Sequence, residues 1–473
     1  MTEPGLLVSA ATIERIHAAA LRVLDEAGMA VEHAGLRTML RGAGCRVAGD
    51  RAYFPPEVVT AALAHIPRTF TLYGREIATQ VEIGGERVIC TNTGIFANIL
   101  DFATGQVRRS TLADVAATTR LLDAMDNVHV VYVSLVDATE MPPSSVTLHD
   151  LAATLQHTIK PLIGPGVTNR AEAEAVIDMA AAVRGGREVL RRYPLITPFI
   201  CPLSPLRLPY DLGEALLALA GAGMPLDSLV NPVMGATAPY TLAGTLTQGH
   251  AEALALAVMA QIVAPGLPIL YQNTPSVADM RSMTSTTGGP ETGLLRQAAM
   301  LLARQAGIPG CAHGHTSSAR LDFQAAEEKS LNGLLIAAAR PAILGGMGAL
   351  ANVTLTAYET IALDNERYGA ILRSLQGIAG DDDLLAVDVI ADLAAGGSVM
   401  HNPHTLRYLR SAEVWRPRLA VRGGLSGGAL PEETSLERAR AETVRLLASH
   451  RVAALPASVT AEINAILARW DHN

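Results

Sequence analysis

From about residue 86 onward, short apolar runs alternate with longer stretches in which apolar residues recur at helical spacing. The short runs are rich in Val, Ile or Leu and have the continuous hydrophobic character of strands that are covered on both faces. They number eight, over residues 87–92, 128–135, 161–166, 195–203, 226–234, 268–273, 308–312 and 341–346. Helical spacing predicts helices between them over residues 112–125, 171–183, 212–222, 242–263, 293–306 and 322–339.

This alternation predicts an α/β fold, namely a (β/α)8 TIM barrel over residues 81–350. A doubly wound open sheet is the alternative interpretation. The eight strand–helix units favour the barrel, and so does the absence of a Gly-x-Gly-x-x-Gly turn after the first strand.

Helical patterns flank the barrel on both sides. Residues 1–80 are expected to form a helical N-terminal subdomain, with an amphipathic helix over 11–29 that stops at Gly28. Residues 351–473 are expected to form a helical C-terminal extension that packs on the barrel. Its predicted helices cover residues 384–395, 404–411, 434–448 and 457–470.

Composition limits the partners of this chain. Of its 473 residues, 49% are hydrophobic and 17% charged, which implies a large core and favours a homo-oligomer that buries further surface. The net charge is -8 and no basic run exceeds Arg191-Arg192, so we expect no nucleic-acid partner.

The same composition predicts a cytoplasmic protein. Its four cysteines form no Cys-x-x-Cys pair, as is typical of chains with reduced thiols. Residues 1–9 lack the basic and apolar regions of a secretion signal. The longest apolar stretch, residues 253–264, is shorter than the ~20 residues that span a bilayer, so no membrane partner is expected.

In a parallel barrel the chemistry lies where strands end, and the side chains at those positions are mostly neutral here. No glycine-rich loop with a following Lys is present to hold phosphates, and no Gly-x-Ser-x-Gly elbow. Paired carboxylates for glycoside hydrolysis are also missing at the strand ends. Phosphoryl transfer, serine hydrolysis and glycoside hydrolysis are therefore disfavoured.

The strand-like run over residues 308–312 leads into His313 and His315. Side chains two residues apart on a strand share a face, so both imidazoles could ligate zinc. Alternatively, one imidazole lines the barrel mouth and the other caps a loop. Since no other strand end offers an acidic or His ligand, no tightly bound metal is expected.

A second cluster of polar residues lies between the sixth and seventh predicted strands. It contains Arg281 and, after Gly288-Gly289-Pro290, Glu291 at the start of a helix. Glu291 either caps that helix, where the dipole favours a carboxylate, or faces the barrel mouth.

Several motifs in order along the chain resemble the trimethylamine methyltransferase family. Near the N-terminus these are Leu24-Asp25-Glu26-Ala27-Gly28 and Leu72-Tyr73-Gly74-Arg75. In the barrel they are Cys201-Pro202-Leu203-Ser204-Pro205-Leu206, residues 235–244, Gly314-His315-Thr316, and Asp322 with Gln324 and Glu328. Further on they are Glu359, Asp364-Asn365-Glu366 and His404-Thr405.

The resemblance implies a (β/α)8 barrel that moves a methyl group from an amine to a corrinoid protein. One branch of the family carries pyrrolysine at the position of His315, and an imidazole cannot form the amine adduct proposed for pyrrolysine. The chain therefore resembles the non-pyrrolysine branch, which is associated with quaternary amines such as glycine betaine. It departs from the family pattern at Ser317 and Ala319, where an Asp and a Lys are usual.

This chemistry suits a neutral mouth. A quaternary ammonium leaves as a neutral tertiary amine, so its methyl transfer needs no general acid, and a Co(I) corrinoid supplies the nucleophile. The chain has no Asp-x-His-x-x-Gly corrinoid motif, so the cobalamin is expected on a partner protein. The expected substrate is a betaine-like quaternary amine or a tertiary methylamine.

The predicted site follows from these requirements. His315 and Glu291 are the expected catalytic residues. Aromatic faces bind ammonium groups, and His or Arg side chains bind a substrate carboxylate. The expected substrate-binding residues are His313, Tyr271, Asn273, Thr237, Ser204, Arg281, Phe199, Tyr132 and Met347. Two alternatives stay open: a metal-assisted hydrolase that uses His313 and His315, and a non-catalytic protein that binds cationic osmolytes.

Overall fold

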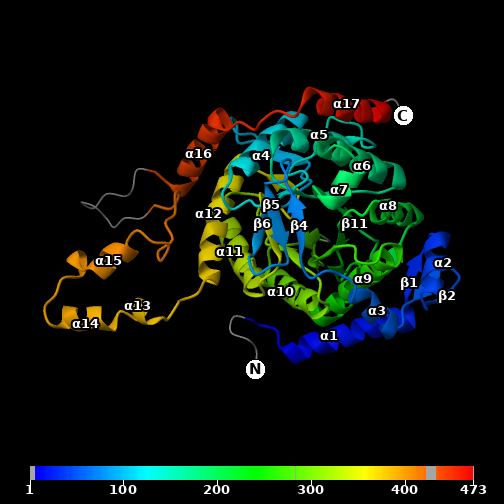
Figure 1. The fold of residues 1–473 in the computed structure, drawn as a ribbon, viewed down its shortest axis with the longest axis horizontal. Helices are drawn as coiled ribbons and strands as arrows, with labels where there is room; N and C mark the ends of the chain where they lie inside the picture. The colour runs from blue at the N-terminus through cyan, green and yellow to red at the C-terminus, as the bar shows by residue number, and fades with distance from the viewer. Residues whose placement is uncertain (1–5, 283, 422–432, 472–473) are drawn as a thin grey trace.

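The computed structural model describes residues 6–282, 284–421 and 433–471. At its centre lie two sheets of parallel strands (Figure 1). The larger sheet contains β9 (Val131–Tyr132), β10 (Leu162–Gly166), β11 (Ile196–Ile200), β13 (Leu226–Val230) and β15 (Ile269–Asn273). The smaller contains β18 (Cys311–His313), β19 (Ile343–Met347) and β6 (Ile89–Asn92). Each strand overlaps one predicted run, and the α/β class is confirmed.

The two sheets meet at both of their edges. A parallel bridge pairs Tyr271 of β15 with Gly310, just before β18. On the other side, the backbone N–H of His129 donates to the carbonyl of Cys90 in β6 at 2.9 Å. The inner face of the strands carries one compact hydrophobic cluster, called here the inner cluster. Its residues in or directly before the central strands are Ile89, Val130, Tyr132, Ile163, Leu270, Cys311, Ala342 and Ile343.

Helices surround the strands (Figure 1). They are α4 (Leu112–Ala124), α5 (Val146–His157), α6 (Arg170–Arg184), α8 (Tyr210–Gly221), α9 (Leu242–Val263), α10 (Pro290–Gln305), α11 (Phe323–Ala338) and α12 (Tyr358–Leu375). Six of these were predicted, whereas α5 and α12 were not. In α9, residues 249–261 are buried on every side, which explains its nearly continuous apolar sequence.

The N-terminal region contains short strands besides the expected helices. Helices α1 (Ala10–Arg22), α2 (Ala34–Gly42) and α3 (Pro56–Leu63) are interleaved with the short strands β1 (Met29–Val31), β2 (Arg46–Ala48) and β3 (Arg51–Tyr53). These strands form a sheet with β12 (Arg207–Leu208). Strands of three residues are too short to show a period of two in the sequence. Gly28 does end the first helical segment, at φ 64°, as predicted.

A hairpin of β4 (Phe70–Tyr73) and β5 (Gln80–Ile83) packs against the inner cluster. Its apolar residues Phe70, Leu72 and Ile83 are buried there. The hairpin lies at the end where the central strands begin, because the N–H of Tyr73 donates to the carbonyl of Pro194, just before β11. The inner face is therefore covered at this end, and the opposite end is left for a site.

The C-terminal extension has two parts. Helices α16 (Ser435–Ser449) and α17 (Ala457–Asp471) pack beside α12 and α6. Helices α13 (Asp382–Leu385), α14 (Val387–Ala394) and α15 (Pro403–Tyr408) project away from the body (Figure 1) and have no buried residue. Helices α13 and α15 contact each other through Asp383, but α13–α15 bury no residue against the described part of the chain. The division of the chain into three domains stays a prediction.

Within the described residues, none of the helices combines the length and the apolar character needed to cross a bilayer.

Candidate functional site

The site is built around the end of β18. His313 is the last residue of this strand and pairs in register with Gly345 of β19. A Cβ at residue 345 would lie 2.4 Å from His313 Nδ1, so the imidazole can lie across β19 only because residue 345 is glycine. Gly314 in turn packs directly against Gly333 of α11. Both His313 and His315 are buried.

Thr93, which follows β6, joins the two imidazoles. Its hydroxyl lies 2.5 Å from His313 Nδ1 and 2.9 Å from His315 Nε2. The other nitrogen of His315, Nδ1, accepts a hydrogen bond from Arg296, so Nε2 carries the proton and donates to Thr93. Thr93 can then donate to His313. The bond from Arg296 thus sets the tautomer of His315.

Arg296 enters the site from α10 and is 2% exposed. Its guanidinium donates to His315 Nδ1 at 3.0 Å, and also to the carbonyls of His313 and Pro275. Among the described residues no carboxylate lies within ion-pair distance of it. Burial lowers the pKa of Arg296 only to about 10, so the group is a buried, uncompensated cation at neutral pH.

Both imidazoles are neutral at physiological pH. Burial, reinforced by the charge of Arg296, lowers the pKa of His313 to about 3 and the pKa of His315 well below its usual value. One buried positive charge flanked by two neutral imidazoles favours an anionic ligand.

Helix α11 and the segment before α10 hold the loop that follows His315. Glu328 accepts hydrogen bonds from the Thr316 hydroxyl at 2.5 Å and from the Ser317 N–H at 2.7 Å. The Ser317 hydroxyl accepts from the Gly288 N–H at 3.1 Å, while Ala319 is exposed. These contacts tie the loop to α11 and to the segment before α10.

Two aromatic rings flank the imidazoles on the inner face. The Tyr132 ring meets His313 edge-on with centroids 5.9 Å apart, and its centroid is 6.2 Å from that of Phe199. Tyr132 belongs to the inner cluster and Phe199 packs against it.

A cavity of about 470 Å³ opens beside these rings, at the ends of β9, β10 and β11. Its lining includes Phe199, Cys201, Asp137 and Asp150. Burial, together with the neighbouring Asp137, raises the pKa of Asp150 to about 8. Four exposed apolar side chains stand on loops at this end of the strands, namely Ile95, Leu203, Tyr240 and Met280.

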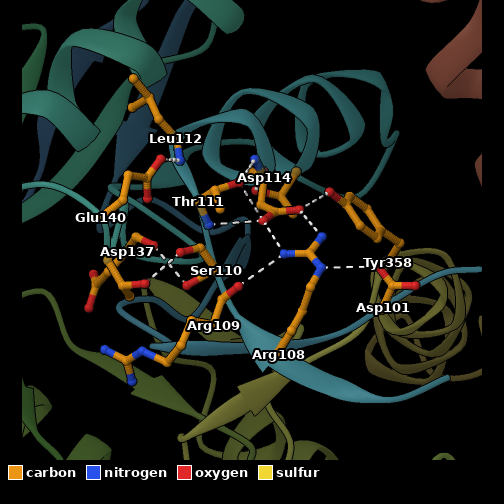
Figure 2. Close-up of polar contacts among 12 residues, drawn as sticks. Asp101, Arg108, Arg109, Ser110, Thr111, Leu112, Asp114, Asp137, Glu140 and Tyr358 are labelled. Atoms are coloured by element: carbon orange, nitrogen blue, oxygen red, sulfur yellow. Dashed lines mark hydrogen bonds and ion pairs between the residues drawn. The ribbon is translucent and has the colours of Figure 1, made fainter. Parts of the chain in front are cut away.

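Figure 2 shows how the wall of this cavity is fixed. The Ser110 hydroxyl donates to the carbonyl of Asp137 at 2.7 Å. Just beyond it, Arg108 binds both oxygens of Asp114 at 2.6 and 2.8 Å, and the Tyr358 hydroxyl donates to the same carboxylate. Burial alone would raise the pKa of Asp114, but these bonds outweigh it and lower the pKa to about 2. The start of α4 is thus anchored to β8 (Val107–Arg109) and to α12.

Other predicted site residues lie away from this cluster. Tyr271 and Asn273 face α9, where the Tyr271 hydroxyl lies 3.0 Å from His250. Met347 is buried in the outer hydrophobic core. Arg281 is exposed in the turn between β16 (Ser276–Asp279) and β17 (Thr284–Thr286), and Glu291 is exposed in the first turn of α10.

Two hydroxyl residues from the prediction have structural partners. Ser204 donates to Glu252 at 2.7 Å, and the Thr237 hydroxyl accepts from the Val233 N–H at 2.9 Å. The structure therefore groups His313, His315, Tyr132 and Phe199, and it does not bring the other seven predicted residues to them.

The sequence prediction placed neither Arg296 nor Thr93 in the site. Arg296 had a recognisable signal, because it lies among Leu295, Ala298 and Ala299 on the buried side of its helix. The zinc interpretation of the His pair gains no further ligand: in the described part of the chain, no group of three or more His, Cys, Asp or Glu residues is placed to hold a metal.

Solved structures with a similar fold include the hydroxylamine complex of MtmB, with a TM-score of 0.58 and 12% identity, covering 96% of this chain and 90% of that one. The Methanosarcina barkeri monomethylamine methyltransferase MtmB gives a TM-score of 0.53, also at 12% identity, with 95% and 94% covered. At this identity the likeness concerns the fold alone.

Sequence relatives are closer. Trimethylamine methyltransferase MttB of Desulfitobacterium hafniense (strain DCB-2) is 32% identical over 457 residues, 96% of this chain and 91% of the relative. Glycine betaine methyltransferase of Desulfitobacterium hafniense (strain Y51) is 29% identical over 461 residues, with 97% and 95% covered. The sequence model of the family trimethylamine methyltransferase (MTTB) matches residues 3–473, which confirms the resemblance drawn from the motifs. The chain therefore belongs to the trimethylamine methyltransferase family.

Proposed function

We propose that this protein transfers a methyl group from a betaine-like quaternary amine to a Co(I) corrinoid that a partner protein carries. The observation that carries the proposal is Arg296, a buried cation without a carboxylate partner among the described residues, bonded to His315 at the end of β18. A site built only for a cationic methylamine would gain nothing from a buried positive charge. The names of the relatives, trimethylamine and glycine betaine methyltransferases, support amine methyl transfer.

The proposed architecture is the (β/α)8 barrel. Both edges of the two parallel sheets are linked, at Tyr271–Gly310 and at His129–Cys90, which supports a closed ring of eight strands. His313, His315 and Thr93 follow or end strands of that ring. They would then lie at its carboxyl mouth, where barrels of this type carry their sites.

Within this mouth each end of a betaine has a matching group. The guanidinium of Arg296 suits the carboxylate. Tyr132 and Phe199 offer aromatic faces to the trimethylammonium end. The substrate would thus be held with one N-methyl carbon toward the opening.

The remaining chemistry needs little from this chain. A Co(I) corrinoid, bound to its carrier, supplies the nucleophile. A neutral tertiary amine leaves, so no side chain has to donate a proton, and we assign His315 to orientation of the substrate. The exposed residues Ile95, Leu203, Tyr240 and Met280 form an apolar rim that suits docking of a flat, partly apolar macrocycle. A catalytic role of Glu291 stays a prediction.

We also propose a homo-oligomer. The arm formed by α13–α15 (residues 382–408) has no buried residue of its own but exposes Val387, Ile390 and Met400. Short helices without a core are not stable alone in water. A neighbouring copy of the chain would cover them.

Methyl transfer to free, reduced cobalamin tests the function. Purified protein should convert Co(I) cobalamin to methylcobalamin with glycine betaine as donor, followed by the change in the absorption spectrum. Trimethylamine and choline serve as comparison donors, one without a carboxylate and one with a hydroxyl in its place. Equal rates with all three, or none with any from well-folded protein, would contradict the proposal.

A further inference from the structure

A carboxyl group without a structural role lies on the inner face of the strands. Asp227 is the second residue of β13 and pairs in register with Phe199 of β11 and Leu270 of β15, both of which contact or belong to the inner cluster. It is fully buried, and neither of its carboxyl oxygens has a hydrogen-bond partner among the described residues. Burial of an unbonded carboxyl destabilises a fold, so its presence points to a ligand.

Among the described residues, Asp227 has no partner of opposite charge. The titratable groups that face it are Tyr132 on β9, Cys201 after β11 and Cys311 on β18. All three are neutral acids whose pKa is raised, by burial first and then by neighbouring negative charge that includes Asp227. Burial likewise raises the pKa of Asp227 well above its usual range, so this carboxyl holds its proton more strongly than an exposed one does.

The cavity beside the mouth reaches the neighbours of Asp227. Phe199 and Cys201 both line it. The Phe199 ring lies against β10, where a Cβ on Gly166 would approach it to 2.2 Å. Phe199 is only half-buried and pairs in register with Asp227, so its side chain lies next to the carboxyl on the same face of the sheet and also lines the cavity.

We propose that Asp227 is the anionic partner of the substrate's ammonium group, and that a quaternary ammonium which enters between Tyr132 and Phe199 displaces the carboxyl proton to solvent and pairs with the carboxylate that remains. This inference rests on the proposed function and names the group that receives the cation. One proton leaves for each cation bound, because the carboxyl ionises only when the ammonium supplies a compensating charge. The positive end of a betaine then faces Asp227, and its negative end faces Arg296.

Calorimetric titration tests the coupling directly and needs no corrinoid. The full chain is titrated at about pH 7 in two buffers of different ionisation heat, which reports protons released on binding. Three probes separate the charges: tetramethylammonium, with the cation alone; tert-butylacetate, the uncharged-carbon analogue of glycine betaine, with the carboxylate alone; and glycine betaine, with both. We expect tetramethylammonium and glycine betaine to release close to one proton, and tert-butylacetate to release none.

The variant Asp227→Asn keeps the shape of the side chain but replaces the carboxyl with an amide that cannot ionise. It should abolish proton release and weaken tetramethylammonium binding about tenfold or more, while tert-butylacetate binds as before. Glu252→Gln is the matched control, since Glu252 is equally buried but its oxygens are bonded to Ser204, Gln248 and the Leu206 N–H. A melting curve checks that each variant folds.

The outcomes also separate this inference from the function it rests on. Unchanged proton release in Asp227→Asn, or cation binding without any proton release in the wild type, would overturn it even if methyl transfer occurs. Coupled cation binding that depends on Asp227 would support it even if glycine betaine is not a donor. Failure of all three probes to bind at millimolar concentration would count against both.

Discussion

At the scale of single residues, the buried charged side chains of this protein differ in whether a group of opposite charge binds them. Asp114 receives bonds from Arg108 and Tyr358, so its charge has partners on two elements. Among the described residues, Arg296 donates to two carbonyls and an imidazole and has no carboxylate partner. A bonded ion pair stabilises the fold, whereas an uncompensated ion must be explained by what binds it.

Arg296→Met should therefore affect binding more than folding. Loss of a buried charged partner costs about 2–5 kcal/mol of binding, so KM for glycine betaine should rise at least thirtyfold or so, while the thermal midpoint falls by only a few degrees. Steady-state methyl transfer and calorimetric melting measure the two effects. Arg281→Met, at an exposed arginine in the turn between β16 and β17, is the control. An equal rise in KM in this variant would mean that Arg281 binds the substrate carboxylate.

Asp150 gives the fold a pH dependence. Its pKa of about 8 in the native state exceeds the value of about 4 in an unfolded chain. Between these values only the unfolded chain has lost the proton, so the free energy of unfolding falls as pH rises from about 4 to about 8.

Asp150→Asn should remove this fall. Compared with the wild type, the variant should gain about 2 kcal/mol or more at about pH 8 and nothing at about pH 4. Urea unfolding at the two pH values measures it, with Asp388→Asn, an exposed carboxyl on α14, as control. Parallel pH curves for wild type and Asp150→Asn would show that Asp150 ionises normally in the native state.

At the scale of elements, the site depends on positions where strands lack side chains. Gly345 of β19 leaves room for the His313 imidazole. The period of apolar residues predicted β18 and β19 as strands. It could not predict that a ring from one would lie across the other, because register between strands is set by the whole sheet.

Gly345→Ala tests this dependence. The added Cβ would meet His313 Nδ1 at 2.4 Å, so the imidazole must move and its bond to Thr93 must break. We expect kcat/KM to fall about a hundredfold, with far-ultraviolet circular dichroism unchanged. Gly221→Ala, where a Cβ meets nothing within 4 Å, should keep full activity. Activity retained in both variants would remove His313 from the site.

At the scale of the whole molecule, the arm of α13–α15 differs from the other helices in its lack of buried residues. The longer helices bury one face against the body, whereas the short helices of the arm leave their apolar side chains exposed. An apolar surface of this kind marks a contact with another protein.

Replacing Val387 and Ile390 of the arm with Asp should therefore lower the molecular mass measured by light scattering, because two charges would have to be buried in the interface. Val107→Asp is the control, since Val107 is an exposed apolar residue of β8 that is far from the arm in the sequence. This variant should leave the mass unchanged. A wild-type protein that is already monomeric, or an arm variant with unaltered mass, would contradict an interface between copies through the arm and would mean that another partner covers it.

Much of this protein follows from the order of its residues. Continuous apolar runs mark all eight central strands, since a strand buried on both faces needs no polar residue. The His313-x-His315 pair and the family motifs are equally local, and both can be read without coordinates. Asp227 too is visible as one acid in an apolar run.

The partners of those residues could not be read in the same way. Thr93, Arg296 and Gly345 meet His313 and His315 from three other elements, and Tyr271 and Asn273 turn toward α9 although they end a central strand. A period of two tells which side chains share a face, but not which face is turned inward when both are apolar. That choice, and with it the charge of the site, arises only when distant segments pack together and exclude water from between them.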